Sequence, residues 1–356
     1  MTQTEMFGFL KSGAVLRLPS GKVRIWAGPW KPTDFQKSQE ISVSYAQFFG
    51  SGLESFESSQ PVLETEVSEL RRQLQSFLET QPSRSSFTSE AFTAPNLDGF
   101  RESFQIIQGK IHRGELEKAV PVTFARSSEI PGDAERAHML FHALESHRGL
   151  YVFGTWNEQE GILGASPEIL FHQQGSLLRT MALAGTLPKS SGLPKETLLK
   201  DPKELKEHRL VVEDISRRLE KLGWLKVGKT EVVEFPMLSH LKTEIEVETS
   251  PINAKELVQI LHPTAALGVF PRNYGIQWLQ ALPDQSDRGI FGAPIVFSIS
   301  RTECIAIVAI RCLQWDAKGS RIGAGCGLVK ESDLFKEWQE IAAKRESVFR
   351  TLGLMK

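Results

Sequence analysis

The commonest pattern along the chain is a short apolar run, often alternating with polar residues, which is typical of β-strands. Near the N-terminus, two such runs flank Pro19-Ser20-Gly21 and predict two strands joined by a turn. From residue 97 onward the runs become denser and more regular. They predict strands at 119–125, 150–156, 161–171, 177–187, 231–237, 293–298, 303–315 and 320–329.

Apolar residues three or four positions apart, the spacing of a helix with one buried face, occur in four stretches. These stretches span 61–80, 99–114, 202–222 and 332–352. Because the strands follow one another in hairpin-like groups and the helices lie elsewhere, the pattern favours antiparallel sheets with helices outside them over a parallel βαβ sheet. We therefore predict an α+β fold.

Two polar stretches interrupt the first hundred residues. Residues 50–60, rich in Ser, Gly and Glu, predict an exposed loop. Residues 81–98, rich in Ser, Thr and Pro, are the best candidate for a linker, although they could equally form a loop lying over one domain. We accordingly divide the chain into an N-terminal strand-and-helix region, 1–96, packed on the core, and a catalytic region, 97–356.

Composition argues against several kinds of partner. The 42 basic and 43 acidic side chains give a formal charge of −1, which supplies no basic field for nucleic acid or for an anionic membrane. No apolar run reaches the ~18 residues that span a bilayer, and the N-terminus shows no export signal. Cys304, Cys312 and Cys326 lie in apolar or glycine-rich runs, which fits core thiols rather than a disulfide or zinc site. We expect a cytoplasmic protein without nucleic-acid or membrane partners.

The predicted helix at 202–222 carries carboxylates on its apolar side. At 100° per residue, Glu204 and Glu207 share one side with His208, Val211 and Ile215. Carboxylates on a buried face are costly unless a cation or hydrogen-bond donors meet them.

The last predicted helix carries a second pair, Glu337 and Glu340, on the flank of its apolar stripe together with Lys344. Two such pairs could supply the oxygen ligands that Mg²⁺ prefers. The alternative, which spacing alone favours, is two solvated faces with an ordinary i,i+4 pair between Glu340 and Lys344.

Single charges interrupt several apolar runs. Arg311 in the run 304–312 needs either an anion or a route to water, and the pattern leaves both open. Burial of Lys118 and Glu168 would move both pKa values toward neutrality and suit them to base and acid catalysis. An edge lysine and a turn glutamate are the alternatives that sequence alone favours. The glycine-rich run 321–327 predicts either a bulge or a close approach of a ligand to the backbone.

Taken in order, eight groups of residues resemble the chorismate-utilising enzyme family. This family comprises isochorismate synthases, salicylate synthases and the large subunits of anthranilate and aminodeoxychorismate synthases. The matching strings are GELEKAV (114–120), GASPEILF (164–171), MALAGT (181–186), KELKEHRLVVEDI (203–215), LSHLKT (238–243), LHPTAA (261–266), AIRC (309–312) and GAGCGLV followed by EWQEIAAK (323–344). The resemblance covers residues 97–354 and implies two stacked antiparallel sheets between helical layers.

The resemblance also implies a site around chorismate. Glu207 and Glu340 would bind Mg²⁺ directly, and Glu204 and Glu337 would support them. The ion would hold the ring carboxylate of the substrate. Residues expected to contact the substrate are Gly185, Thr186, His240, Ala266, Phe291, Arg311, Gly325 and Lys344. Of these, Arg311 and Lys344 match the positions that grip the pyruvyl-ether carboxylate.

The choice of attacking group separates the members of the family. Lys118 matches the lysine that acts as general base in the members that add water at C2. In these members Glu168 would correspond to the acid that protonates the departing C4 hydroxyl. Ala184 stands where aminodeoxychorismate synthases carry a nucleophilic lysine. We therefore expect an isochorismate synthase that needs no glutaminase subunit.

A salicylate synthase, an amine-transferring synthase and a chorismate-binding protein without activity remain as alternatives. Salicylate synthases tend to have hydroxyl side chains where this chain has Ala266 and Phe291, which favours a reaction that stops at isochorismate. The sequence does not separate menaquinone from siderophore synthesis.

Overall fold

Two large antiparallel sheets form the centre of the molecule in the computed structural model, which describes residues 1–18, 21–33, 42–81 and 87–355. The first sheet has the strand order β6 (Leu63–Glu66), β2 (Lys22–Ala27), β1 (Gly13–Arg17), β9 (Tyr151–Trp156), β10 (Gly161–Ser166), β19 (Cys312–Asp316), β20 (Gly319–Gly325) and β8 (Val122–Ser127).

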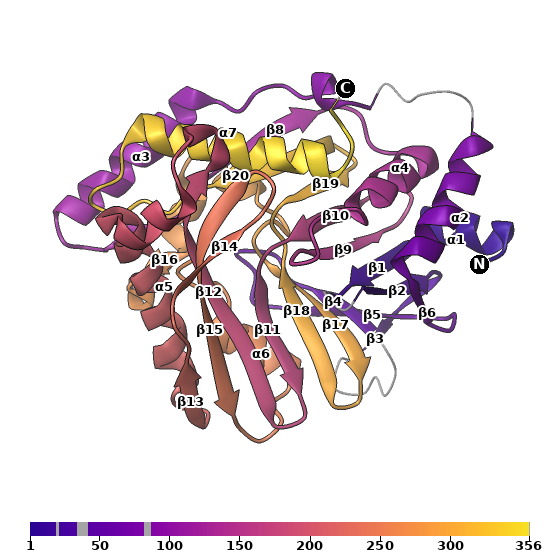
Figure 1. Ribbon diagram of the computed structural model, residues 1–356, viewed down its shortest axis with the longest axis horizontal. Helices are drawn as coiled ribbons and strands as arrows, with labels where there is room; N and C mark the ends of the chain where they lie inside the picture. Colours follow the sequence, from indigo (N-terminus) through magenta and orange to yellow (C-terminus); the bar gives the residue numbers. More distant parts are fainter. Residues whose placement is uncertain (19–20, 34–41, 82–86, 356) are drawn as a thin grey trace.

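The second sheet contains the longest strands, and most of these strands lie below the first sheet in the view of Figure 1. Its order is β13 (Trp224–Val227), β15 (Leu238–Glu248), β12 (Leu177–Pro188), β11 (Ile169–Gln174), β18 (Glu303–Val308), β17 (Pro294–Ser300), β4 (Ser42–Tyr45), β5 (Glu54–Ser58) and β3 (Trp30–Thr33), with β14 (Glu231–Glu234) also paired to β15. A short separate pair joins β7 (Lys118–Ala119) to β16 (Val269–Phe270).

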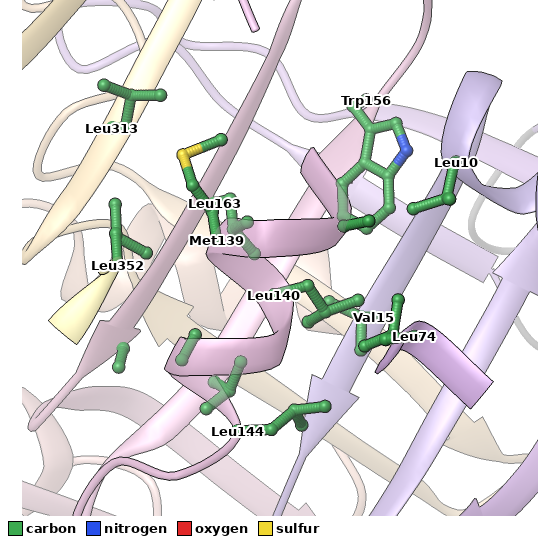
Figure 2. Packing of buried hydrophobic residues seen from close by; sticks show 14 of the residues in the cluster. Leu10, Val15, Leu74, Met139, Leu140, Leu144, Trp156, Leu163, Leu313 and Leu352 are labelled. Atoms are coloured by element: carbon green, nitrogen blue, oxygen red, sulfur yellow. The ribbon is translucent and has the colours of Figure 1, made fainter. Parts of the chain in front are cut away.

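Helices cover the outer faces of both sheets. They are α1 (Gln3–Lys11), α2 (Val67–Glu79), α3 (Leu97–His112), α4 (Asp133–Ala143), α5 (Pro202–Leu219), α6 (Ala254–Leu261) and α7 (Leu334–Thr351). One apolar cluster joins the first sheet to α1, α2, α4 and α7, and Figure 2 shows Leu140 of α4 beside Val15 of β1 and Leu74 of α2. A second cluster joins the other sheet to α5 and α6.

The two sheets also pack on each other. Phe153 and Ile162 of the first sheet share an apolar cluster with Ile295 and Phe297 of the second. Because strand residues alternate between faces, neighbours such as Leu163 and Val296 belong instead to the outer clusters. The α+β fold with two stacked antiparallel sheets between helical layers, predicted above, is therefore confirmed.

Two of the predicted strands each consist of one strand in the first large sheet and one strand in the second. The predicted strand 303–315 consists of β18 in the second sheet and β19 in the first, and the chain crosses between them at 309–311. The predicted strand 161–171 likewise consists of β10 and β11. Periodicity could not locate these crossings because both sheets bury apolar side chains on both faces. The charges at Glu168 and Arg311 fall on the crossings.

The two crossings lie side by side. Val308 N donates to Glu168 O at 3.1 Å, and Ala165 N donates to Arg311 O at 3.1 Å. Arg311 has a φ of 53°, the left-handed region that a bulky residue rarely adopts. Such strain persists only where the surrounding structure holds it, and it is commonest at functional sites.

The N-terminal predictions need further correction. Residues 3–11 form α1, a helix that the sequence analysis did not predict, and Thr2 with Glu5 makes the capping box that starts it. The predicted loop at 50–60 contains β5. The predicted helix at 61–80 begins only at Val67, because 63–66 pair with β2. Pro19, Ser20 and part of the predicted linker lie outside the described residues. Within the described chain, no helix is long and apolar enough to cross a membrane.

Candidate active site

One cleft forms where the two crossings meet α5, α7 and the glycine-rich strand β20. Val120, Leu183, Leu267 and Ile310 give it apolar walls. Ten residues singled out in the sequence line it: Glu168, Gly185, Thr186, Glu207, His240, Ala266, Phe291, Arg311, Gly325 and Lys344. The structure thus brings together residues that are up to 176 positions apart in the sequence. We call this space the inner cleft.

Lys118 lies directly behind the lining of the inner cleft, at the start of β7. Its side chain is completely buried, and Nζ lies 3.3 Å from Glu207 Oε1. Burial lowers the pKa of Lys118, and the nearby Glu207 carboxylate offsets only part of that effect. The close approach depends on Gly327, since a Cβ there would lie 2.5 Å from Lys118 Cε and 2.1 Å from Glu207 Oε1.

Glu168 supplies the second titrating group of the inner cleft. It is 4% exposed, and burial raises its pKa to about 8, with the positive charges of Lys118 and Lys344 opposing the rise. The carboxyl group is therefore largely protonated at neutral pH. The cleft is consequently lined by a carboxyl group shifted toward its acid form, and an amine shifted toward its neutral form lies behind the lining at Glu207.

A chain of polar contacts crosses the cleft from Arg311. Its guanidinium donates to Ser347 Oγ at 2.9 Å and lies 3.3 Å from His240 Nε2, and His240 Nδ1 lies 3.1 Å from Thr186 Oγ1. Burial, with the charges of Arg311 and Lys344, holds the pKa of His240 well below its usual value, so the ring is neutral. In the described part of the chain no carboxylate forms an ion pair with Arg311. A half-buried guanidinium in this state is suited to a ligand anion.

The sheet bulges beside this chain of contacts. Gly185 has a φ of 78°, and the register of β12 against β15 shifts between Ala184 and Thr186. The bulge directs Thr186 N to Glu204 Oε2, at 2.8 Å. A bulge of this kind redirects a side chain next to a site, and here it connects the inner cleft to the first turn of α5.

The four glutamates predicted for a metal lie on the first two turns of α5 and α7. Asp201 and Asp333 cap these helices, so the glutamates lie at the helix ends that favour negative charge. Glu337 and Glu340 are 2% and 6% exposed. The alternative of a solvated face on α7 is therefore wrong, because Lys203 of α5 and Lys344 of α7 itself compensate the burial of these carboxylates.

Lys203, which the sequence analysis did not single out, lies among these carboxylates. Its Nζ is 3.0 Å from Glu204 Oε1, 3.2 Å from Glu207 Oε2 and 2.9 Å from Glu337 Oε1. On α7, Lys344 Nζ lies 2.6 Å from Glu340 Oε1 and donates to Gly325 O at 2.9 Å. The i,i+4 spacing of Lys203 and Glu207 was the available signal for the contact between these two residues.

The carboxylates differ in charge state because their cations differ. Burial and neighbouring carboxylates raise the pKa of Glu204 to about 8, although Lys203 opposes the rise. The same causes raise the pKa of Glu337 to about 7, and its Oε2 is buried without a hydrogen-bond partner. Burial would also raise the pKa of Glu207, but Lys118, Lys203 and Lys344 hold it at about 2.

A second cleft, which we call the outer cleft, lies on the other side of these glutamates. It shares Thr186 with the inner cleft and is lined by Lys203, Glu204, Glu337 and Glu340. A third cavity lies at the edge of the two sheets, where Trp30, Tyr45, Thr155 and Arg321 line it. Arg321 there is already paired with Asp316, at 2.6 Å, and the cavity contains none of the predicted residues.

A family model described as "Chorismate binding enzyme" matches residues 43–353. The chain belongs to the chorismate binding enzyme family. The resemblance stated from the sequence is therefore confirmed, and the match extends into the N-terminal region.

Curated members of the family with similar sequences carry isochorismate synthase names. The chain is 28% identical over 278 residues to the vibriobactin-specific isochorismate synthase of Vibrio cholerae, covering 75% of this chain and 69% of that protein. It is 29% identical over 267 residues to isochorismate synthase MenF of Escherichia coli, covering 72% and 61%. It is 32% identical over 201 residues to isochorismate synthase EntC of the same species, covering 54% and 51%. The chain thus spans half to two thirds of these proteins' lengths.

Solved structures of the family have the same fold. The menaquinone-specific isochorismate synthase MenF from Escherichia coli matches with a TM-score of 0.76 and 21% identity over 98% of this chain and 91% of that one. Anthranilate synthase component I from Streptococcus pneumoniae matches with a TM-score of 0.67 and 18% identity over 86% and 80%. At these identities the structures establish the fold.

Proposed function

We propose that this member of the family is an isochorismate synthase, which adds water at C2 of chorismate and removes the C4 hydroxyl. The observation that carries the proposal is the pairing of Lys118 and Glu168 around one cleft. Burial lowers the pKa of the amine and raises that of the carboxyl group to about 8. Water addition with loss of a hydroxyl needs one base and one acid, and the directions of the two shifts favour these roles.

In the proposed reaction, neutral Lys118 takes a proton from water as the oxygen attacks C2. The ring double bonds shift, and the C4 hydroxyl leaves with a proton from Glu168. The hydroxyl gained and the hydroxyl lost balance, so the product is an isomer of the substrate. The neutral ring of His240 and the backbone around Gly325 would lie along the substrate ring.

Arg311 and Lys344 are the proposed contacts for the pyruvyl-ether carboxylate. Arg311 is half-buried, and its pKa, although burial lowers it to about 10, leaves the guanidinium charged at neutral pH. Its contacts with Ser347 and His240 fix its orientation without neutralising it. A fixed cation of this kind can form two hydrogen bonds to a carboxylate.

We propose Mg²⁺ as the cofactor, held by Glu207 and Glu340 with support from Glu204 and Glu337. The donor set fits a hard cation that prefers carboxylate oxygens. The buried Glu337 Oε2 has no partner, and the raised pKa values of Glu204 and Glu337 indicate too little positive charge around them. When bound, the ion would offset the charge of the substrate's ring carboxylate.

The apolar side chains of Ala266 and Phe291 in the inner cleft support a reaction that ends at isochorismate rather than salicylate. Ala184, which also lines the cleft, offers no amine for a covalent route. We expect no glutaminase partner, and a cytoplasmic location stays a prediction. Both menaquinone and siderophore synthesis are consistent with the relatives' names.

The test is to incubate the pure protein with chorismate and Mg²⁺ and to identify the products chromatographically, with and without ammonia. We expect isochorismate under both conditions. Salicylate, anthranilate or unchanged chorismate would contradict the proposal and would indicate, respectively, a salicylate synthase, an amine-transferring enzyme or a binding protein.

A further inference from the structure

The proposed reaction leaves one buried cation of the site without a role. Lys203 is 15% exposed at its side chain and contacts three of the four glutamates assigned to the metal. Two of these contacts are to its own helix, but Glu337 belongs to α7. Lys203 therefore connects the two acidic helices at the position where their carboxylates converge.

The electrostatics of the cluster explain why a cation is needed there. Four carboxylates on two helix ends repel one another, and burial makes each charge costly. The neighbouring ammonium groups do not reach all four: Lys118 faces Glu207, and Lys344 faces Glu340. Lys203 is the described ammonium that meets Glu204 and Glu337. Its contacts, at 2.9–3.2 Å, are those of a compact cation among oxygen ligands.

The outer cleft offers space for the Lys203 side chain outside the four-glutamate cluster. Lys203 lines this cleft, whose walls carry seven carboxylate side chains and two lysines. Among these carboxylates, Glu331 and Asp333 lie outside the four-glutamate cluster. A lysine side chain is flexible along four methylene groups, so its ammonium can turn away from the cluster toward the outer cleft that it lines.

We propose that Lys203 is a built-in counter-cation that holds the four-glutamate site together without metal and that a divalent ion must displace it toward the outer cleft. Lys203 thereby sets the affinity of the site for Mg²⁺ and keeps that affinity low. The proposal rests on the metal site of the proposed function.

The test is calorimetric titration of Mg²⁺, and separately of Mn²⁺, into the chelator-treated full chain without chorismate. We expect Lys203→Met to bind the ion at least tenfold more tightly than the original chain. In chelator its melting temperature should fall, because the four carboxylates lose their cation, and Mg²⁺ should restore it. Lys203→Arg, which keeps the charge, should bind the ion no more tightly than the original.

Lys206→Met is the matched control. It removes the same charge from the same helix, but Lys206 pairs with Glu331, at 3.1 Å, and contacts none of the four glutamates. Its affinity for Mg²⁺ should stay within about twofold of the original chain. Equal tightening in both methionine variants would overturn the proposal, because a general change in charge would then explain it.

Two outcomes separate this proposal from the proposed function. If the original chain binds Mg²⁺ and Lys203→Met binds it no better, the role of Lys203 is refuted and the metal site stands. If neither protein binds Mg²⁺ or Mn²⁺, the metal assignment itself is refuted. Should Lys203→Met not fold, a Lys203→Arg variant that binds Mg²⁺ more tightly than the original chain would also refute the proposal.

Discussion

Lys118 and Lys203 lie on opposite sides of Glu207, yet their surroundings have opposite effects. Lys118 faces Oε1 of this carboxylate and contacts no other in the described structure, so burial dominates and its pKa falls. Lys203 faces Oε2 and two further carboxylates, which outweigh burial and raise its pKa well above the usual value. The number of carboxylates around each amine, and not burial alone, therefore sets the direction in which its pKa moves.

The largest expected effect concerns Lys118, the lysine on the inner-cleft side of Glu207. Lys118→Met removes the proposed base but keeps the length of the side chain. We expect kcat/KM for isochorismate formation to fall by ~10²–10⁴, measured by product formation from chorismate. The circular dichroism spectrum should not change. Full turnover by this variant would refute the proposed mechanism.

Glu168 allows the pH dependence to be worked out. The reaction needs the protonated carboxyl group, so kcat/KM should decline as pH rises through about 8. Glu168→Gln should lower the rate by ~10²–10⁴ and remove this decline from whatever activity is left. A decline at the same pH in the variant would assign it to another group.

Glu168 should also affect stability. Its folded pKa of about 8 lies above the ordinary value of 4.5, so the folded state loses stability as pH rises from 4.5 to 8. Glu168→Gln should therefore gain on the original chain by up to ~4 kcal/mol between pH 5 and pH 8. Chemical denaturation at both pH values measures this difference. Equal changes in both proteins would show that Glu168 ionises normally.

On the outer side, Glu337→Gln tests whether the cluster is built for a metal. We expect Mg²⁺ affinity to fall by ~10–100-fold, as for other supporting groups around metals. In chelator the variant should melt at the same or a higher temperature, because an under-compensated carboxylate is gone while an oxygen acceptor for Lys203 stays. Lower stability in chelator with unchanged Mg²⁺ affinity would assign Glu337 to structure alone.

The smallest effect is expected from Ser347→Ala. The hydroxyl holds Arg311 at 2.9 Å without touching the inner cleft. A net hydrogen bond to a charged group contributes ~1.5–3 kcal/mol, and His240 retains part of the orientation. We therefore expect KM for chorismate to rise by roughly tenfold with little change in kcat. A drop in kcat with unchanged KM would contradict a role in substrate binding.

The sequence indicated the site better than it indicated the strands around it. Glu168 and Arg311 stood out because a charge interrupting an apolar run needs a reason. The same runs were misread as single strands, since apolar periodicity does not show where a chain leaves one sheet for another. The buried positions of Glu337 and Glu340 were missed for a related reason: their compensating cations include Lys203, which comes from a different helix.

Local signals also went unused. Thr2 and Glu5 form a capping box that marks a helix start, and the spacing of Lys203 and Glu207 marks an i,i+4 pair. Neither signal is decisive alone, because such spacings are frequent in exposed helices. The connection from Lys203 to Glu337 depends on how α5 and α7 pack, and no property of either segment specifies it.

The paired hydrogen bonds between the two strand crossings have a mechanical consequence. Glu168 and Arg311 are joined through adjacent main-chain amides, Val308 to Glu168 and Ala165 to Arg311. If one sheet moves relative to the other, these two hydrogen bonds hold the backbone segments that carry Glu168 and Arg311 together. These hydrogen bonds therefore favour a constant spacing between the proposed proton donor and the proposed anchor of the substrate.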